Sequence, residues 1–259
     1  MGAVQKQGVD PAGITIRPCP TLEEYERCVE LQRIVWGEDI TVPAPVFVVA
    51  AETGGQVLGA FEGSRLIGFT LALAGIHGAK PFLHSHMTAV VPELQNRGIG
   101  KLLKLAQRAD ALARGIDLVE WTFDPLELRN AHFNLMKLGA VIRRFIPNCY
   151  GITESPLHAG LPTDRLMAEW WLRTKRVALV LTGEAPATTG KAVRISVPAD
   201  ISEWKHKELG HALRVQTEVR EQFQRWFGRG YVATALEGSG PVANYVLEPS
   251  DSSAARFED

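Results

Sequence analysis

Residues His84 to Lys101 read HSHMTAVVPELQNRGIGK, and this stretch decides the fold of the chain. The run from Phe82 to Val91 is rich in apolar and β-branched residues, and Pro92 ends it because proline cannot donate to a sheet ladder. From Gly100 the segment GKLLKLAQRADALARG places leucines and alanines mainly on one helical face, and Gly115 stands where a C-cap is expected. The stretch therefore predicts a strand, a glycine-containing turn and an amphipathic helix in direct succession.

The turn QNRGIG at 95–100 predicts a site for an anion. Glycines lack the Cβ that would keep a ligand off the main chain, and the start of the helix adds partial positive charge. The turn is not a P-loop, because Leu102 follows Gly100-Lys101 and position 95 is not glycine. It is not the dinucleotide fingerprint either, because Leu103 stands where the third glycine is required. A tight structural connection is the alternative interpretation of the turn alone.

The turn resembles the acyl-CoA signature [RQ]-x-x-G-x-[GA] of the GNAT superfamily of N-acetyltransferases, with Gln95, Gly98 and Gly100 in the three specified positions. In that family the signature follows a strand, as it does here. The resemblance implies that the turn binds the pyrophosphate of acyl-CoA and that the strand hydrogen-bonds the pantetheine arm. It therefore implies cofactor contacts for Met87, Thr88, Ala89, Val90, Gln95, Asn96, Arg97, Gly98, Ile99, Gly100 and Lys101.

Two further elements follow in the order that this family has. The sequence predicts a strand from Asp117 to Phe123 and a helix from Arg129 to Ala140. The family's fourth helix often carries a tyrosine that protonates the departing CoA thiolate, and Leu135 occupies that position here. The usual leaving-group acid is thus missing from its usual place.

Other side chains near this position are candidates for contacts with the cofactor. Asn130 and Asn134 lie on the predicted helix, and both are candidates for binding the cofactor. Asn134 can hydrogen-bond the thiol or the pantetheine, and Asn130 is also placed to cap or orient the helix. Cys149 and Tyr150 are candidates for approaching the sulfur. A polar residue on an exposed or capped helix face is an equal interpretation of Asn134, and a phenol at the edge of the core is the favoured one for Tyr150.

His84 and His86 are two residues apart on the predicted strand and so project to one face. The pattern His-x-His-x-x-Ala-Val resembles the arylalkylamine N-acetyltransferases, in which two histidines help to remove a proton from the substrate ammonium. An amine attacks a thioester only with a free lone pair, and histidine, with a pKa of about 6.5, can accept that proton. We predict that His86 is the base, helped by His84 or water; structural histidines are the alternative. No third ligand with sensible spacing completes a metal site.

The acceptor side offers charged candidates. Asp124, after the second predicted strand, is expected to anchor an acceptor ammonium or to form a structural turn. Arg143 and Arg165 are candidates for binding a succinyl or amino-acid carboxylate, because arginine can bind carboxylates through two parallel hydrogen bonds. The alternatives are that at least one of Arg143 and Arg144 has its side chain in solvent and that Arg165 joins a structural network with Asp164 or Glu169.

Composition limits the class of protein. The chain has 259 residues, a formal charge of −1 and 46% apolar residues, so it favours neither a nucleic acid nor an anionic membrane as partner. Three scattered cysteines suit a reducing compartment, and the longest apolar stretch, Leu66 to Ile76, is too short to span a bilayer. A cytoplasmic location is the expectation.

The chain is longer than one acetyltransferase domain of roughly 150 residues. We predict a flexible N-terminus at 1–13, a mixed α/β domain with the GNAT fold at 14–173 and a C-terminal α+β extension at 174–259. The chain resembles a bacterial subgroup of the family whose members have about this length. It shares with them the patterns SHM, DPL, NAxFN and LPTDR, which begin here at Ser85, Asp124, Asn130 and Leu161. Further expected elements are a strand at 15–17, a helix capped by Thr21 and Glu24, a hairpin at 56–74, a strand at 193–197, mostly helix at 200–227 and a hairpin at 231–247.

Together these features predict an acyl-CoA-dependent N-acyltransferase. It would transfer an acetyl or succinyl group to the amine of a small molecule such as an amino acid, by direct attack in a ternary complex. Two alternatives stay open: a non-catalytic acyl-CoA sensor, which the leucine at 135 suggests, and an acetyltransferase that modifies proteins. The sequence leaves homo-oligomerisation open.

Overall fold

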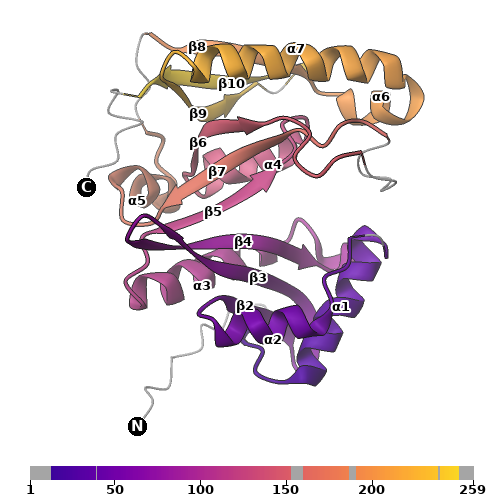
Figure 1. Cartoon of the computed structure of the whole chain (residues 1–259), viewed down its shortest axis with the longest axis vertical. Helices are drawn as coiled ribbons and strands as arrows, with labels where there is room; N and C mark the ends of the chain where they lie inside the picture. The colour runs from indigo at the N-terminus through magenta and orange to yellow at the C-terminus, as the bar shows by residue number, and fades with distance from the viewer. Residues whose placement is uncertain (1–12, 39, 153–159, 187–190, 239, 251–259) are drawn as a thin grey trace. The chain divides into compact units, whose positions relative to one another are not determined.

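The computed structural model describes residues 13–38, 40–152, 160–186, 191–238 and 240–250 (Figure 1). The chain forms two compact units, which divide between Val119 and Glu120, inside a strand whose larger part belongs to the second unit. Each unit combines helices with strands of a sheet, so the predicted mixed α/β class is confirmed.

The first unit contains four antiparallel strands in the order β1-β2-β3-β4. Three helices pack against them, and Phe47, Phe61 and Phe69 are fully buried in the core between. Its elements are β1 (Ile14–Pro18), α1 (Leu22–Trp36), α2 (Ala44–Glu52), β2 (Gln56–Glu62), β3 (Arg65–His77), β4 (Lys80–Val90), the 3₁₀ turn η1 (Pro92–Leu94) and α3 (Ile99–Ala113).

Most of these elements are those that the sequence predicts. The hydroxyl of Thr21 accepts from the amide of Glu24 at 3.3 Å, which confirms the predicted cap of α1. The predicted hairpin forms as β2 and β3, and the strand, turn and helix around the glycine turn form as β4, η1 and α3. Helix α2 is the element that the sequence analysis missed. Pro43 and Pro45 suggest a loop, but both lie at its start, where no amide donor is needed.

A β-bulge interrupts the pairing of β3 with β4 at the histidines. Leu71 pairs with Met87 and the next residue, Ala72, pairs with Ser85, so His86 has no partner on β3. A bulge bends its strand and redirects the side chain that it carries, and bulges are frequent next to active sites. The side chain of His86 therefore does not follow the regular alternation of side chains between the two faces of the sheet.

The second unit has its strands in the order β5-β7-β6-β9-β10-β8. Its elements are β5 (Leu118–Phe123), α4 (Leu128–His132), the π-helical turn η2 (Phe133–Lys137), β6 (Val141–Ile146), β7 (Arg165–Trp171), α5 (Lys175–Thr182), β8 (Val193–Pro198), α6 (Ile201–Lys207), α7 (Leu209–Phe227), β9 (Tyr231–Glu237) and β10 (Val242–Pro249).

The residues after 173 continue the sheet of the second unit. Ile142 on β6 pairs with Ala233 on β9, and α7 packs against β6, β8 and β9 (Figure 1). Phe223 of α7 stacks on Phe145 and meets Tyr245 edge-on, so the extension and the preceding strands share one core. The predicted boundary at 173–174 thus falls inside a compact unit. That the acetyltransferase domain ends at this boundary stays a prediction.

The predicted helix from Arg129 to Ala140 forms from Leu128 to Lys137, but its second half is a π-helix rather than an α-helix. The α-helix ends at His132, and a wider π turn follows in which the amide of Leu138 donates to the carbonyl of Phe133. The wider turn lets Leu135 and Leu138 both face the core. Asn134, directly before Leu135, is buried as well rather than exposed.

Candidate active site

The glycine turn opens α3 with an uncapped main chain. Asn96 and Gly98 have left-handed φ angles of 62° and 86°, and no side chain caps the helix. The amides of Lys101 and Leu102 donate to the carbonyl of Gly98 at 2.9 and 3.1 Å. The amides before them lie at the start of the helix, where no intrahelical acceptor exists. The turn therefore offers N–H groups and the positive end of the helix dipole to an anion.

The surface of this turn is open to a ligand. A Cβ built on Gly98 or on Gly100 would meet no atom within 4 Å. The side chain of Gln95 turns back and donates to the carbonyl of Val90 at 3.1 Å, which ties the turn to the end of β4. These features fit the pyrophosphate of a CoA thioester, which needs close approach to consecutive amides.

The two histidines of β4 lie near each other, as predicted. Their ring centroids are 6.2 Å apart, and His86 is exposed while His84 is half-buried. Partial desolvation of the ring, followed by repulsion from His84, lowers the pKa of His86 below its ordinary value. His86 is therefore neutral at pH 7 and has a lone pair that can accept a proton.

A buried lysine lies beneath the same strand, and the sequence analysis missed it. The ammonium of Lys104 on α3 donates to the hydroxyl of Ser85 at 2.6 Å and to the side-chain oxygen of Gln107 at 3.1 Å. Burial lowers the pKa of Lys104 to about 7. Lys104 follows Leu103, and both lie on the buried face of α3. This position next to an apolar residue was the sequence feature that could have indicated the burial of Lys104.

Asp124 is committed to contacts within the second unit. Its buried carboxylate accepts from the amide of Leu126 at 2.8 Å and from the ammonium of Lys205 at 2.8 Å. These contacts agree with the turn interpretation of Asp124. An interaction with an acceptor ammonium stays a prediction for this residue.

The predicted arginines differ in their surroundings. Arg143 pairs with Glu169, and Arg144 pairs with Glu120 at 3.2 Å. The guanidinium of Arg165 lies over the ring of Tyr150, 5.4 Å from its centroid.

Tyr150 is a half-exposed residue rather than a phenol at the edge of the core. Its hydroxyl hydrogen-bonds that of Thr122 at 2.9 Å. With Arg165 over its ring, it gives the second unit a polar group of one guanidinium and two hydroxyls.

The polar residues of the fourth helix are placed differently from each other. Asn130 is exposed on α4, whereas Asn134 is 2% exposed and its Nδ2 has no hydrogen-bond partner among the described residues. Leu135 is fully buried and cannot donate a proton. A buried amide without an acceptor is costly, and a contact of Asn134 with the cofactor stays a prediction.

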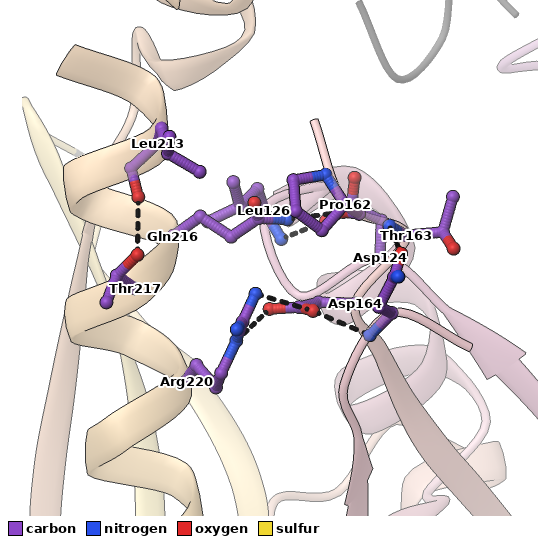
Figure 2. Close-up of polar contacts among 10 residues, drawn as sticks. Asp124, Leu126, Pro162, Thr163, Asp164, Leu213, Gln216, Thr217 and Arg220 are labelled. Carbon is purple, nitrogen blue, oxygen red and sulfur yellow. Dashed lines mark hydrogen bonds and ion pairs between the residues drawn. The ribbon is translucent and has the colours of Figure 1, made fainter. Parts of the chain in front are cut away.

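The loop before β7 is held by the C-terminal extension, which the sequence analysis did not foresee. Figure 2 shows Asp164 facing Arg220 of α7, with Gln216 reaching the carbonyl of Pro162 at 2.8 Å. The sequence offered Asp164 as a partner for Arg165, but its carboxylate pairs with Arg220, and that of Glu169 pairs with Arg143.

The described residues contain no group of three or more histidine, cysteine, aspartate or glutamate side chains placed to hold a metal ion. In the same part of the chain, none of the helices has the length and apolar character needed to cross a membrane.

The structure combines an uncapped glycine turn, a bulged strand before it and a mixed α/β scaffold. The model of the acetyltransferase (GNAT) family matches residues 15–139. The chain thus contains a domain of the GNAT acetyltransferase family, and the predicted resemblance and fold are confirmed. Membership supports acyl-CoA-dependent acetyl transfer to an amine acceptor.

Solved structures of low sequence identity share this fold. The ribosomal-protein-S18-alanine N-acetyltransferase from Escherichia coli has a TM-score of 0.50 and 14% identity, over 62% of this chain and 95% of that one. NAA60 from Arabidopsis thaliana, solved with acetyl-CoA, has a TM-score of 0.50 and 15% identity, over 61% of this chain and 99% of that one. The smu.2055 protein from Streptococcus mutans UA159 has a TM-score of 0.51 and 16% identity, over 61% of this chain and 99% of that one. A sequence search of curated proteins finds no match.

Proposed function

We propose that the protein transfers an acetyl or succinyl group from a CoA thioester to the amine of a small molecule, such as an amino acid. The observation that carries this proposal is the open turn before α3, which follows a strand whose bulge carries His86. The turn supplies the anion site, and the strand supplies a neutral base. Their direct succession in the chain keeps the two functions close to each other.

The reaction forms a bond between the amine nitrogen and the thioester carbonyl carbon and breaks the carbon–sulfur bond. An ammonium has no lone pair, so one proton must leave before attack. We assign that proton to a ring nitrogen of His86, because its lowered pKa keeps the ring neutral at pH 7. Main-chain amides of β4 near the bulge are assigned to the developing oxyanion. As the tetrahedral intermediate collapses, its nitrogen loses a second proton to solvent, and the departing CoA thiolate takes up one proton from solvent or from a donor other than Leu135.

Other predicted residues receive roles on the same basis. The amides of 96–100 are assigned to the pyrophosphate and those of Met87 to Val90 to the pantetheine arm. Asn134 is assigned to a polar atom of the cofactor, which its buried, unpartnered Nδ2 supports. Arg165 is assigned to a substrate carboxylate, whereas the ion pair of Arg143 with Glu169 favours a structural role for Arg143.

Thiol release from acetyl-CoA and succinyl-CoA, measured separately, tests the proposal. The acceptors are D- and L-amino acids and simple aryl and alkyl amines, and calorimetry measures the binding of CoA. Release that depends on a small amine supports the proposal and identifies the donor and acceptor. Tight CoA binding without release on any of these amines contradicts it and favours a sensor or a protein acceptor. The matched control is His86→Gln, which should slow release strongly and leave CoA binding intact.

A further inference from the structure

The C-terminal extension holds both ends of the segment 124–140, which contains α4 and the π turn. We infer that Lys205 is a positioning residue for this segment and, through it, for the cofactor contact of Asn134. This inference rests on the proposed function, in which Asn134 binds the CoA thioester. Its structural part involves only residues of the second unit.

The start of the segment is held by two side chains of the extension. The ammonium of Lys205 on α6 donates to Asp124 at 2.8 Å and to Glu127 at 3.1 Å. The hydroxyl of Tyr245 on β10 donates to the carbonyl of Pro125 at 2.7 Å. Lys205 is 3% exposed, so its charge is compensated by these carboxylates rather than by water. Burial alone would lower the pKa of Lys205, but Asp124 and Glu127 raise it, and the ammonium stays charged.

The end of the segment is held by α5 and β9. The guanidinium of Arg176 donates to the carbonyl of Gly139 at 3.1 Å, and the amide of Leu236 contacts the sulfur of Met136 at 3.5 Å. A Cβ on Gly139 would lie 3.2 Å from Val177, because α5 packs closely there. The extension therefore fixes the last turn as well as the first.

The segment has little stability of its own. Helix α4 has five residues, and its N-cap Glu127 makes no side-chain cap hydrogen bond. Helices of this length do not form alone in water, so tertiary contacts must set the register of α4 and of the π turn. Because Lys205 binds both carboxylates before the first turn, it is the charged contact that sets where the helix begins. That start determines where Asn134 lies.

The test uses the full chain with Lys205→Met, and Lys207→Met as the matched control. Lys207 is on the same helix but is 71% exposed and pairs only with Glu203 among the described residues. Hydrogen exchange of peptides within 124–140 reports the segment, and calorimetry with acetyl-CoA reports the site. For Lys205→Met we expect faster exchange, acetyl-CoA binding weaker by about tenfold or more, and KM for acetyl-CoA changed more than kcat. Lys207→Met should match the wild type in each measurement.

A milder variant keeps the inference testable if Lys205→Met does not fold. Glu127→Gln removes one of the two carboxylates and leaves Asp124 in place, so it should show the same changes at smaller size. Faster exchange with unchanged acetyl-CoA affinity and KM in folded variants overturns the inference, since Lys205 then has only a structural role. Wild-type protein that binds no acetyl-CoA overturns the proposed function, and this inference with it. The two failures are therefore distinguishable.

Discussion

The guanidinium of Arg220 binds the carboxylate of Asp164 through two hydrogen bonds, with Nε 2.8 Å from Oδ2 and Nη2 3.0 Å from Oδ1 (Figure 2). The Asp164 side chain is fully buried, and it also accepts from the amide of Asn148 at 2.9 Å. Gln216, one turn earlier on α7, reaches the same loop. One face of the extension's long helix thus holds the entry to β7.

Arg220→Met is expected to lower the free energy of unfolding by about 3 kcal/mol, because it leaves a buried carboxylate without its counter-charge. Urea denaturation measures the loss. The control is Arg225→Met on the same helix, an exposed position where the change should stay within about 0.5 kcal/mol. Equal stability of the two variants would show that the pair contributes nothing.

Gly100→Glu should weaken CoA binding by more than about tenfold, because it places a carboxylate beside the predicted pyrophosphate site. The fold should tolerate it, since a Cβ there meets no atom within 4 Å and no acidic residue occupies the first turn of α3. Calorimetry with CoA is the measurement, and the thermal midpoint should not fall. Gly100→Ala is the control and should lose far less affinity. Unchanged affinity in Gly100→Glu would remove the turn as the anion site.

The pH profile should report His86. Because its pKa lies below about 6.5 and its neutral form is the base, kcat/KM should rise with pH through a limb below that value. His84→Gln removes the repulsion that lowers this pKa, so the limb should move to higher pH. His86→Gln should abolish the limb and leave CoA affinity unchanged. A limb that persists in His86→Gln belongs to another group.

Lys104 should make stability depend on pH. Its pKa is about 7 in the folded protein against 10.5 ordinarily, so the unfolded chain binds more protons between these values. Stability therefore rises with pH across that window, and the penalty for burying the charge is present in full below pH 7. Lys104→Met should reduce this rise, as denaturation at pH 6, 7.5 and 9 can measure. The exposed Lys80→Met should keep it. The same slope in both variants would exclude Lys104 as its source.

Local sequence patterns predicted the first unit well. Alternating and apolar runs predicted β2, β3 and β4, and Thr21 with Glu24 predicted the start of α1. Both kinds of pattern depend only on residues that are close in the chain, so the sequence shows them directly. The sequence did not predict the π turn at Asn134. A single wider turn changes which side of the helix a residue lies on, but it leaves no mark in the amino-acid composition.

By itself the sequence determined the glycine turn, the paired histidines and the family, because each is a short run of residues whose chemistry acts locally. Only the tertiary structure decided the partners of charged groups. Asp164 pairs with Arg220, 56 residues later, and Asp124 with Lys205, 81 residues later. The bulge at His86 and the burial of Lys104 also come from packing. Such pairings depend on which segments the fold brings together, and one-dimensional spacing carries no record of that.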